Sequence, residues 1–189
     1  MSSLHHLKLT SCKRKKNIVF IILHIIAWII FVGLCIEAGA LLTNFGFSIF
    51  KPSMVSHLYQ QLDMSDIYNK STWTFYSMYS FILFIAILKA AMFYVVIQLL
   101  LKLDLTKPFS MYVANKIMLI SYYALSIGII SHLAREVSKY LMHHDYKVDN
   151  LSQFWADSQA FILMAPVIYV IGTIFKKGVE IQTENDLTV

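Results

Sequence analysis

The sequence predicts an all-α integral membrane protein, a bundle of four spanning helices with both termini in the cytoplasm. Its 189 residues are 58% hydrophobic and only 14% charged, whereas about 25% of the residues in average soluble domains are charged. The apolar residues gather in four long runs, and basic residues gather at the ends of these runs. We place the spans at about 18–42, 74–101, 111–133 and 154–175.

The first run follows a basic cluster, Lys13–Lys16, and continues almost unbroken from Ile18 to Leu42. A helix of this length measures about 37 Å, which exceeds a bilayer core of about 30 Å. Lys and Arg beside a first span keep that end in the cytoplasm. Ala38-Gly39-Ala40 has the form of a signal-peptide cleavage site. The run is much longer than the apolar region of a signal peptide, so we expect an uncleaved helix.

The segment Asn44–Trp73 is predicted to be an outer loop, with aromatic side chains at the level of the lipid headgroups. Apolar residues at helical spacing predict a short interfacial helix within this loop. These residues are Met54, Val55, Leu58 and Leu62.

The connection between the second and third spans is short and predicted to be cytoplasmic. Pro108 disfavours a helical Lys107, and Ser110 is a suitable N-cap for the third helix. Ala124 and Gly128, four residues apart, predict a face where another helix approaches closely. Beyond Leu133 the apolar residues keep helical spacing, so we expect this helix to continue to about Met142.

The fourth span follows a polar turn over His143–Leu151. Ser152 is predicted to cap this span, and Pro166 is predicted to kink it. After Lys176 and Lys177 the chain ends in acidic residues. The predicted organisation is therefore a cytoplasmic basic tail over 1–17, a membrane domain over 18–175 and a cytoplasmic acidic tail over 176–189.

The distribution of Lys and Arg supports this topology. Ten of them lie in predicted cytoplasmic segments and five in outer segments, with Lys89 inside a span. An excess of positive charge in the cytoplasmic segments is the usual pattern of multi-pass proteins. The net charge of +5 therefore reflects topology and contact with lipid, and we expect no direct binding of nucleic acid.

Glu37 and Lys89 are the candidate functional residues inside the spans. A charge at bilayer depth costs several kcal/mol and is usually paired, neutralised or functional. We place Glu37 about 9 Å and Lys89 about 22 Å from the outer ends of their spans, a difference that disfavours a simple ion pair. Either residue could serve a proton or ion pathway. The alternatives are a hydrated or hydrogen-bonded carboxyl near the interface for Glu37, and an ammonium bonded to serines or carbonyls for Lys89.

Histidines near the outer end raise the question of a metal site. His132 and Glu136 lie four residues apart on one helix, and His143 and His144 follow. Nothing in the sequence fixes the second pair against the first, so we expect neither a metal nor another cofactor. Gly-rich phosphate loops, nucleophile elbows and His-Glu-x-x-His motifs do not occur in the sequence, and we expect no enzymatic activity.

Two stretches carry a family resemblance: Leu103–Ser110 in the connection, and the tail over Phe175–Glu180 and Glu184–Val189. In these residues the sequence resembles an uncharacterised bacterial membrane family known as domain of unknown function 2975. The resemblance implies a small inner-membrane protein of four helices. Members of the family are often encoded beside a small helix-turn-helix regulator, which implies a regulatory pairing. The family has no established activity or catalytic residues to transfer.

We therefore expect a non-enzymatic regulatory or interaction module in the bacterial inner membrane. Its expected partners are the lipid bilayer, a soluble cytoplasmic regulator and further copies of itself. The candidate docking residues are Lys107, Pro108, Phe109, Glu184, Asn185, Asp186, Leu187, Thr188 and Val189. The alternative is a small transporter, or an ion- or proton-conducting component, that uses Glu37 and Lys89 and needs an oligomer to form a pathway.

Overall fold

Four long helices make up most of the protein, and each is long and apolar enough to cross a membrane. The computed structural model describes residues 18–50, 64–103 and 110–187. The long helices are α1 (Ile18–Phe50), α3 (Thr72–Lys102), α4 (Met111–Met142) and α5 (Ser158–Leu187). Two short helices join them, α2 (Ser65–Lys70) and the 3₁₀ helix η3 (Asp149–Phe154). The predicted all-α architecture with four spans is confirmed.

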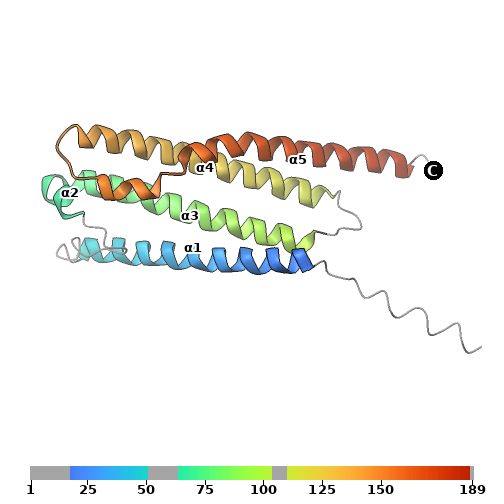
Figure 1. Cartoon of the computed structure of the whole chain (residues 1–189), viewed down its shortest axis with the longest axis horizontal. Helices are drawn as coiled ribbons and strands as arrows, with labels where there is room; N and C mark the ends of the chain where they lie inside the picture. The colour runs from blue at the N-terminus through green and yellow to red at the C-terminus, as the bar shows by residue number, and fades with distance from the viewer. Residues whose placement is uncertain (1–17, 51–63, 104–109, 188–189) are drawn as a thin grey trace, which may run out of the picture.

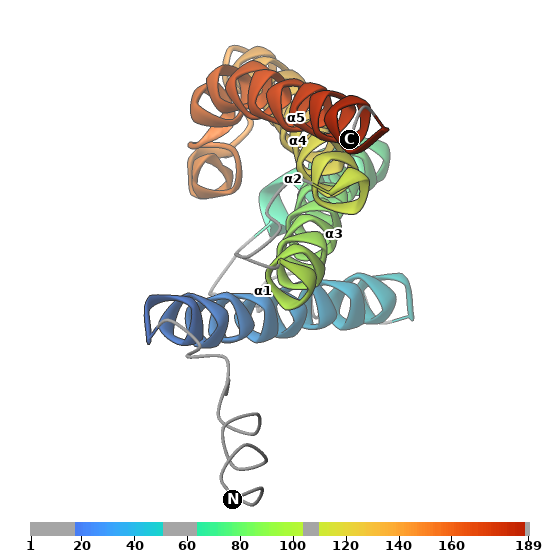
Figure 2. The ribbon, with the colours of Figure 1, turned by 90° about the vertical axis from the view of Figure 1, so that its right-hand side faces the viewer.

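The long helices stand side by side in the order α1, α3, α4, α5 and alternate in direction (Figure 1). Each helix contacts its neighbour in this row, and α1 crosses α3 obliquely (Figure 2). The start of α1 and the end of α5 lie at one end of the row, together with the ends of α3 and α4 that the Leu103–Ser110 connection joins. We call this end, predicted to be cytoplasmic, the inner end, and the opposite end, which carries α2 and η3, the outer end.

The bounds of α4 follow the sequence prediction closely. The side chain of Ser110 accepts a hydrogen bond from the backbone N–H of Val113 at 3.3 Å, which is the predicted N-cap. The helix continues to Met142, also as predicted. A similar cap starts α3, where the Ser71 hydroxyl accepts from the N–H of Thr74 at 3.3 Å.

Helices α4 and α5 approach each other closely because glycines lie at their contact. A Cβ atom on Gly128 would stand 2.9 Å from the backbone nitrogen of Ile162, and one on Gly172 would stand 3.2 Å from that of Met118. Ala124 is buried in the same contact face of α4. The predicted close-packing face around Gly128 is therefore confirmed.

Helix α1 lies at the end of the row and packs against α3. The rings of Phe45 and Tyr79 stack with centroids 5.2 Å apart, and those of Phe31 and Tyr94 lie 5.9 Å apart. The Tyr79 hydroxyl also donates a hydrogen bond of 3.0 Å to the carbonyl oxygen of Leu41. Most other side chains of α1 are exposed apolar groups, which suits a helix surrounded by lipid.

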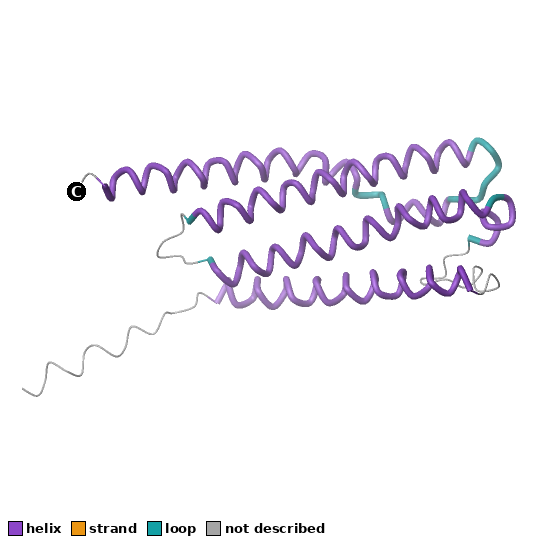
Figure 3. Tube along the Cα trace, turned by 180° about the vertical axis from the view of Figure 1, so that it is seen from behind, coloured by secondary structure: helices purple, strands orange, loops and turns teal. Residues whose placement is uncertain are grey.

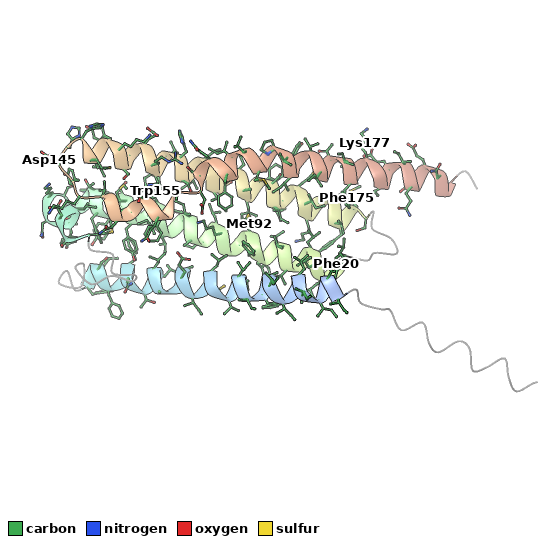
Figure 4. All side chains as sticks on the ribbon, in the orientation of Figure 1. Phe20, Met92, Asp145, Trp155, Phe175 and Lys177 are labelled. Carbon is green, nitrogen blue, oxygen red and sulfur yellow. The ribbon has the colours of Figure 1, made fainter. Side chains whose placement is uncertain are left out.

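The outer end carries a closely packed apolar cluster, which we call the outer cap. Its side chains come from α2, α3, η3 and the residues flanking α2 and η3, and each is at most 3% exposed. The outer cap consists of Met64, Ile67, Phe75, Val148, Leu151 and Trp155. Figure 4 shows Trp155 beneath α4 at this end of the molecule.

The outer cap changes the predicted start of the fourth helix. Ser152 lies inside η3 and does not cap a spanning helix, since α5 begins at Ser158. Val148, Leu151 and Phe154 recur at the three-residue spacing of a 3₁₀ helix, and their burial holds this segment in the cap instead of extending α5. Asp157, which falls inside the predicted span 154–175, directly precedes α5.

One further predicted boundary was wrong. Helix α1 continues to Phe50, so Asn44–Phe50 is helix and not loop. Helix α5 continues beyond the predicted span, so the predicted tail is helical from Lys176 to Leu187. The predicted interfacial helix around Met54 to Leu62 lies outside the described residues.

Candidate functional site

The depth of each charged residue follows from its position along a helix. Glu37 stands about 28 Å along α1 from Ile18, close to the outer boundary of a bilayer core of about 30 Å. Lys89 stands about 20 Å along α3 from Lys102, well inside that core. Along the helix axes the two residues therefore differ in depth by about 9 Å, less than the sequence suggested.

Glu37 and Lys89 point to different neighbours. Glu37 is half-buried beside Ala38, at the edge of the α1 face that packs on α3. The half-buried Lys89 places its ammonium 5.8 Å from the centroid of the Phe161 ring, on α5 at the far end of the row. No salt bridge joins these two side chains in the described part of the chain. The cation–π contact is the interaction that the structure gives Lys89.

The residues of the outer histidine cluster do not gather around one point. The carboxylate of Glu136 accepts a hydrogen bond of 2.8 Å from Lys139, which lowers its pKa. The His144 ring lies over Tyr140, with centroids 4.3 Å apart. Within residues 18–50, 64–103 and 110–187, no three His, Cys, Asp or Glu side chains converge as metal ligands.

A polar clamp that sequence reasoning missed ties α2 to the turn after α4. The Asp66 carboxylate accepts a hydrogen bond of 3.2 Å from the backbone N–H of Lys147 and lies 3.4 Å from the Lys70 ammonium. Lys70 donates to the backbone carbonyl of Asp145 and stands 5.0 Å from the centroid of the Tyr146 ring. The hydrogen bond from the Lys147 N–H is the main reason that the pKa of Asp66 is lowered. Nothing in the local sequence pairs these two distant segments.

Two lysines converge on one aromatic ring at the inner end. The ammonium of Lys102 lies 4.5 Å and that of Lys116 lies 5.5 Å from the centroid of the Tyr112 ring. Lys116 also donates a hydrogen bond of 2.6 Å to the side-chain oxygen of Gln98. The four-residue spacing of Tyr112 and Lys116 on one helix was visible in the sequence, but the approach of Lys102 depends on how α3 meets α4.

The predicted docking residues fall partly in the described chain. Glu184 and Asn185 are exposed on the last turns of α5, a helix that also includes Asp186 and Leu187. Lys107, Pro108, Phe109, Thr188 and Val189 lie outside the described residues. Figure 3 shows α5 extending beyond the start of α4 at the inner end.

Helices of this length and composition define a multi-pass α-helical membrane protein. The family model described as "Protein of unknown function (DUF2975)" matches residues 57–189, and the chain belongs to that family. The match includes α3, α4 and α5, and α1 precedes it. No curated protein and no solved structure matches the chain.

Proposed function

We propose that the protein is a non-enzymatic membrane module that binds a soluble partner through the inner end of α5. The supporting observation is the length of this helix. Gly128 lies opposite Ile162, and Met118 lies opposite Gly172, so the two helices run antiparallel in fixed register. The first residue of α4, Met111, is therefore level with about residue 179 of α5. The last two turns of α5 project past α4 by about 12 Å.

The projecting turns present side chains to a partner. Glu180 and Ile181 are exposed, and so are the following residues through Asn185. Ile181 is 58% exposed, although it is a large apolar side chain. Glu180 and Glu184, four residues apart, lie on the same face; Lys177 in the preceding turn lies 3.9 Å from Glu180, so it is the projecting end of this face that is acidic. A helix that is already formed loses less conformational entropy on binding than a flexible tail would.

The partner that fits this helix has an apolar groove with basic residues at its rim. Apolar contacts must contribute most of the affinity, because an exposed ion pair contributes only about 0–1 kcal/mol. The match of the family model extends through these turns to residue 189. A regulatory protein on the inner side of the membrane is the class of partner that we favour, in keeping with the regulatory pairing that the family resemblance implies.

The alternative function, transport, depends on Glu37 and Lys89. Lys89 is directed towards α5, whereas Glu37 lies on α1 at the other end of the row. A pathway that used both charges would therefore need a second copy of the chain. This geometry favours the interaction module as the first hypothesis.

Cross-linking in native membranes, followed by purification of the full-length protein, tests the proposal. The measured quantity is the amount of partner recovered with it. Deleting Glu184–Val189 should lower partner recovery, and so should Ile181→Ser. Thr173→Ser, an exposed change within the span, is the matched control and should leave recovery unchanged. Glu37→Gln and Lys89→Gln should also leave partner recovery unchanged when it is expressed per molecule of the variant protein. If these two variants abolish a transport activity while the α5 variants retain full recovery, the alternative replaces our proposal.

A further inference from the structure

We propose that Lys102, Tyr112 and Lys116 form a binding site for the phosphate of an anionic phospholipid at the inner end. The three residues bring two cations to one aromatic ring where α3 ends and α4 begins. The site is separate from the projecting end of α5. Its occupation by lipid does not depend on the proposed partner.

The geometry concentrates positive charge. Because both ammonium groups lie over the Tyr112 ring, they are within about 10 Å of each other. Like charges at that separation repel each other, most strongly where water is scarce. The neutral Gln98 amide is the hydrogen-bond partner of Lys116, and no described carboxylate forms a salt bridge with either lysine. An anion placed between the ammonium groups would relieve the repulsion.

The start of α4 adds to the same field. Tyr112 is in the first turn of this helix, where the aligned backbone dipoles leave a partial positive charge. That turn contains no acidic residue to offset the charge. The helix terminus supports the site but does not define it, since the two lysines provide the full charges.

The depth of the site favours a lipid over a soluble anion. Lys102 is the last residue of α3, and Lys116 lies about 7 Å along α4 from Met111. The predicted spans end at residue 101 and begin at residue 111, so Lys102 lies at the predicted membrane boundary and Lys116 lies just inside it. Basic pockets between spanning helices on the cytoplasmic side are suited to anionic headgroups. Tyr112 is half-buried and offers an aromatic ring at the level where such rings stabilise proteins in membranes.

Lipid binding to the full-length protein in nanodiscs provides the test. The probe is spin-labelled phosphatidylglycerol, diluted into phosphatidylcholine, and the measurement is the fraction immobilised on the protein. Lys102→Gln combined with Lys116→Gln should weaken selection of phosphatidylglycerol by about tenfold. Tyr112→Leu should weaken it less, whereas Tyr112→Phe retains the ring and should bind as the natural protein does. The matched control is Lys176→Gln with Lys177→Gln, which removes two exposed charges at the inner end of α5.

The outcomes distinguish a specific lipid site from attraction of anionic lipid by the net positive charge of the inner end. Equal losses in the two double variants would overturn the proposal, because net charge alone would then explain lipid selection. Unchanged selection after Lys102→Gln with Lys116→Gln would overturn it as well. Displacement of the labelled lipid by inorganic phosphate at the same concentration would show a soluble-anion site and contradict a lipid site. If the double variant does not fold, Tyr112→Leu against Tyr112→Phe provides the same comparison.

Discussion

At the scale of single residues, Glu37 and Asp157 show that charge and depth must be considered together. Both carboxyls were predicted inside spans, but the structure places them in different surroundings. Glu37 is half-buried on α1, whereas Asp157 is exposed immediately before α5. A side chain before a helix is near the positive end of the helix dipole, and Asn substitutes well for Asp there. We therefore expect the two amide substitutions to have unequal effects.

Glu37→Gln should lower protein level in membranes and thermal stability in detergent more than Asp157→Asn does. The physical reason is that a half-buried carboxyl inside a membrane span must be hydrogen-bonded or hydrated by its surroundings, and those surroundings are arranged for a carboxyl. Both variants are compared in the same detergent by the unfolding midpoint. An equal or larger loss for Asp157→Asn would count against a special role for Glu37.

Individual residues also explain which contacts could be predicted. Ser110 capped its helix as expected because capping depends on neighbours only three residues away. The approach of Lys102 to Tyr112 was missed because it depends on the path between two helices. The Lys89 contact with Phe161 was missed for the same reason, since it joins residues from α3 and α5.

At the scale of elements, the contact between α4 and α5 leaves little room for a side chain at Gly128 or Gly172. Gly128→Ala should destabilise the protein by about 1–3 kcal/mol, because the new methyl group would lie 2.7 Å from the Ile162 side chain and 2.9 Å from the Ile162 backbone nitrogen, which cannot move away as the end of a side chain can. Gly33→Ala on α1 is the matched control, since nothing lies within 4 Å of a Cβ atom there. It should be neutral or slightly stabilising, because alanine favours helix. Thermal unfolding in detergent measures both, and similar midpoints for the two variants would refute the close contact.

The clamp between α2 and the turn after α4 should respond to pH. The pKa of Asp66 is lowered from 3.8 in the folded protein, mainly by the hydrogen bond from the Lys147 N–H. Its contribution to stability is therefore complete above pH 3.8 and is lost as the pH falls through the lowered folded value. Asp66→Asn should lower the unfolding midpoint at pH 7.

The difference between the natural protein and Asp66→Asn should narrow below pH 3.8. Midpoints in detergent from pH 7 down to pH 3 measure this change. Glu184→Gln, a change on the exposed end of α5, is the control for a general loss of carboxylate charge. A difference that stays constant with pH would show that the carboxylate does not hold the clamp.

Elements with uniform apolar faces were predictable, and those fixed by tertiary packing were not. The long apolar runs identified all four spans because a membrane helix satisfies its own backbone hydrogen bonds. Helix η3 was not predicted: its first half was assigned to a polar turn and its end to the fourth span, since the burial of Val148 and Leu151 depends on residues near α2. The last turns of α5 were assigned to a cytoplasmic tail because Lys176 and Lys177 mark the predicted end of the span, but the helix itself continues through Gly178. One glycine costs a helix only about 1 kcal/mol, and α5 continues past it.

At the scale of the whole molecule, the outer cap and the inner end differ in packing. The outer end joins α2, η3 and the turn after α4 through apolar burial and the Asp66 clamp. At the inner end the projecting turns of α5 are exposed, and cations converge on Tyr112. Close packing at the outer end and accessible groups at the inner end agree with the proposal that the protein binds its partner at the inner end.

The last prediction concerns which end of the molecule faces the cytoplasm. The excess of Lys and Arg in the inner segments predicts that the inner end is cytoplasmic. In a chain with Cys12 and Cys35 replaced by serine, a single cysteine at Lys147 should react with a membrane-impermeant thiol reagent applied to intact cells. Lys147 is exposed beside the outer clamp, so access there does not require the cap to open.

Single cysteines at Thr106 and Thr188 should react only after the cells are permeabilised. Because the long helices alternate in direction, the ends of α3, α4 and α5 that flank these two positions lie on the side opposite Lys147. Labelling at Thr106 in intact cells, with Lys147 protected, would reverse the orientation. The end of α5 would then face away from any cytoplasmic partner, and the proposed docking would fail even if its helix remained intact.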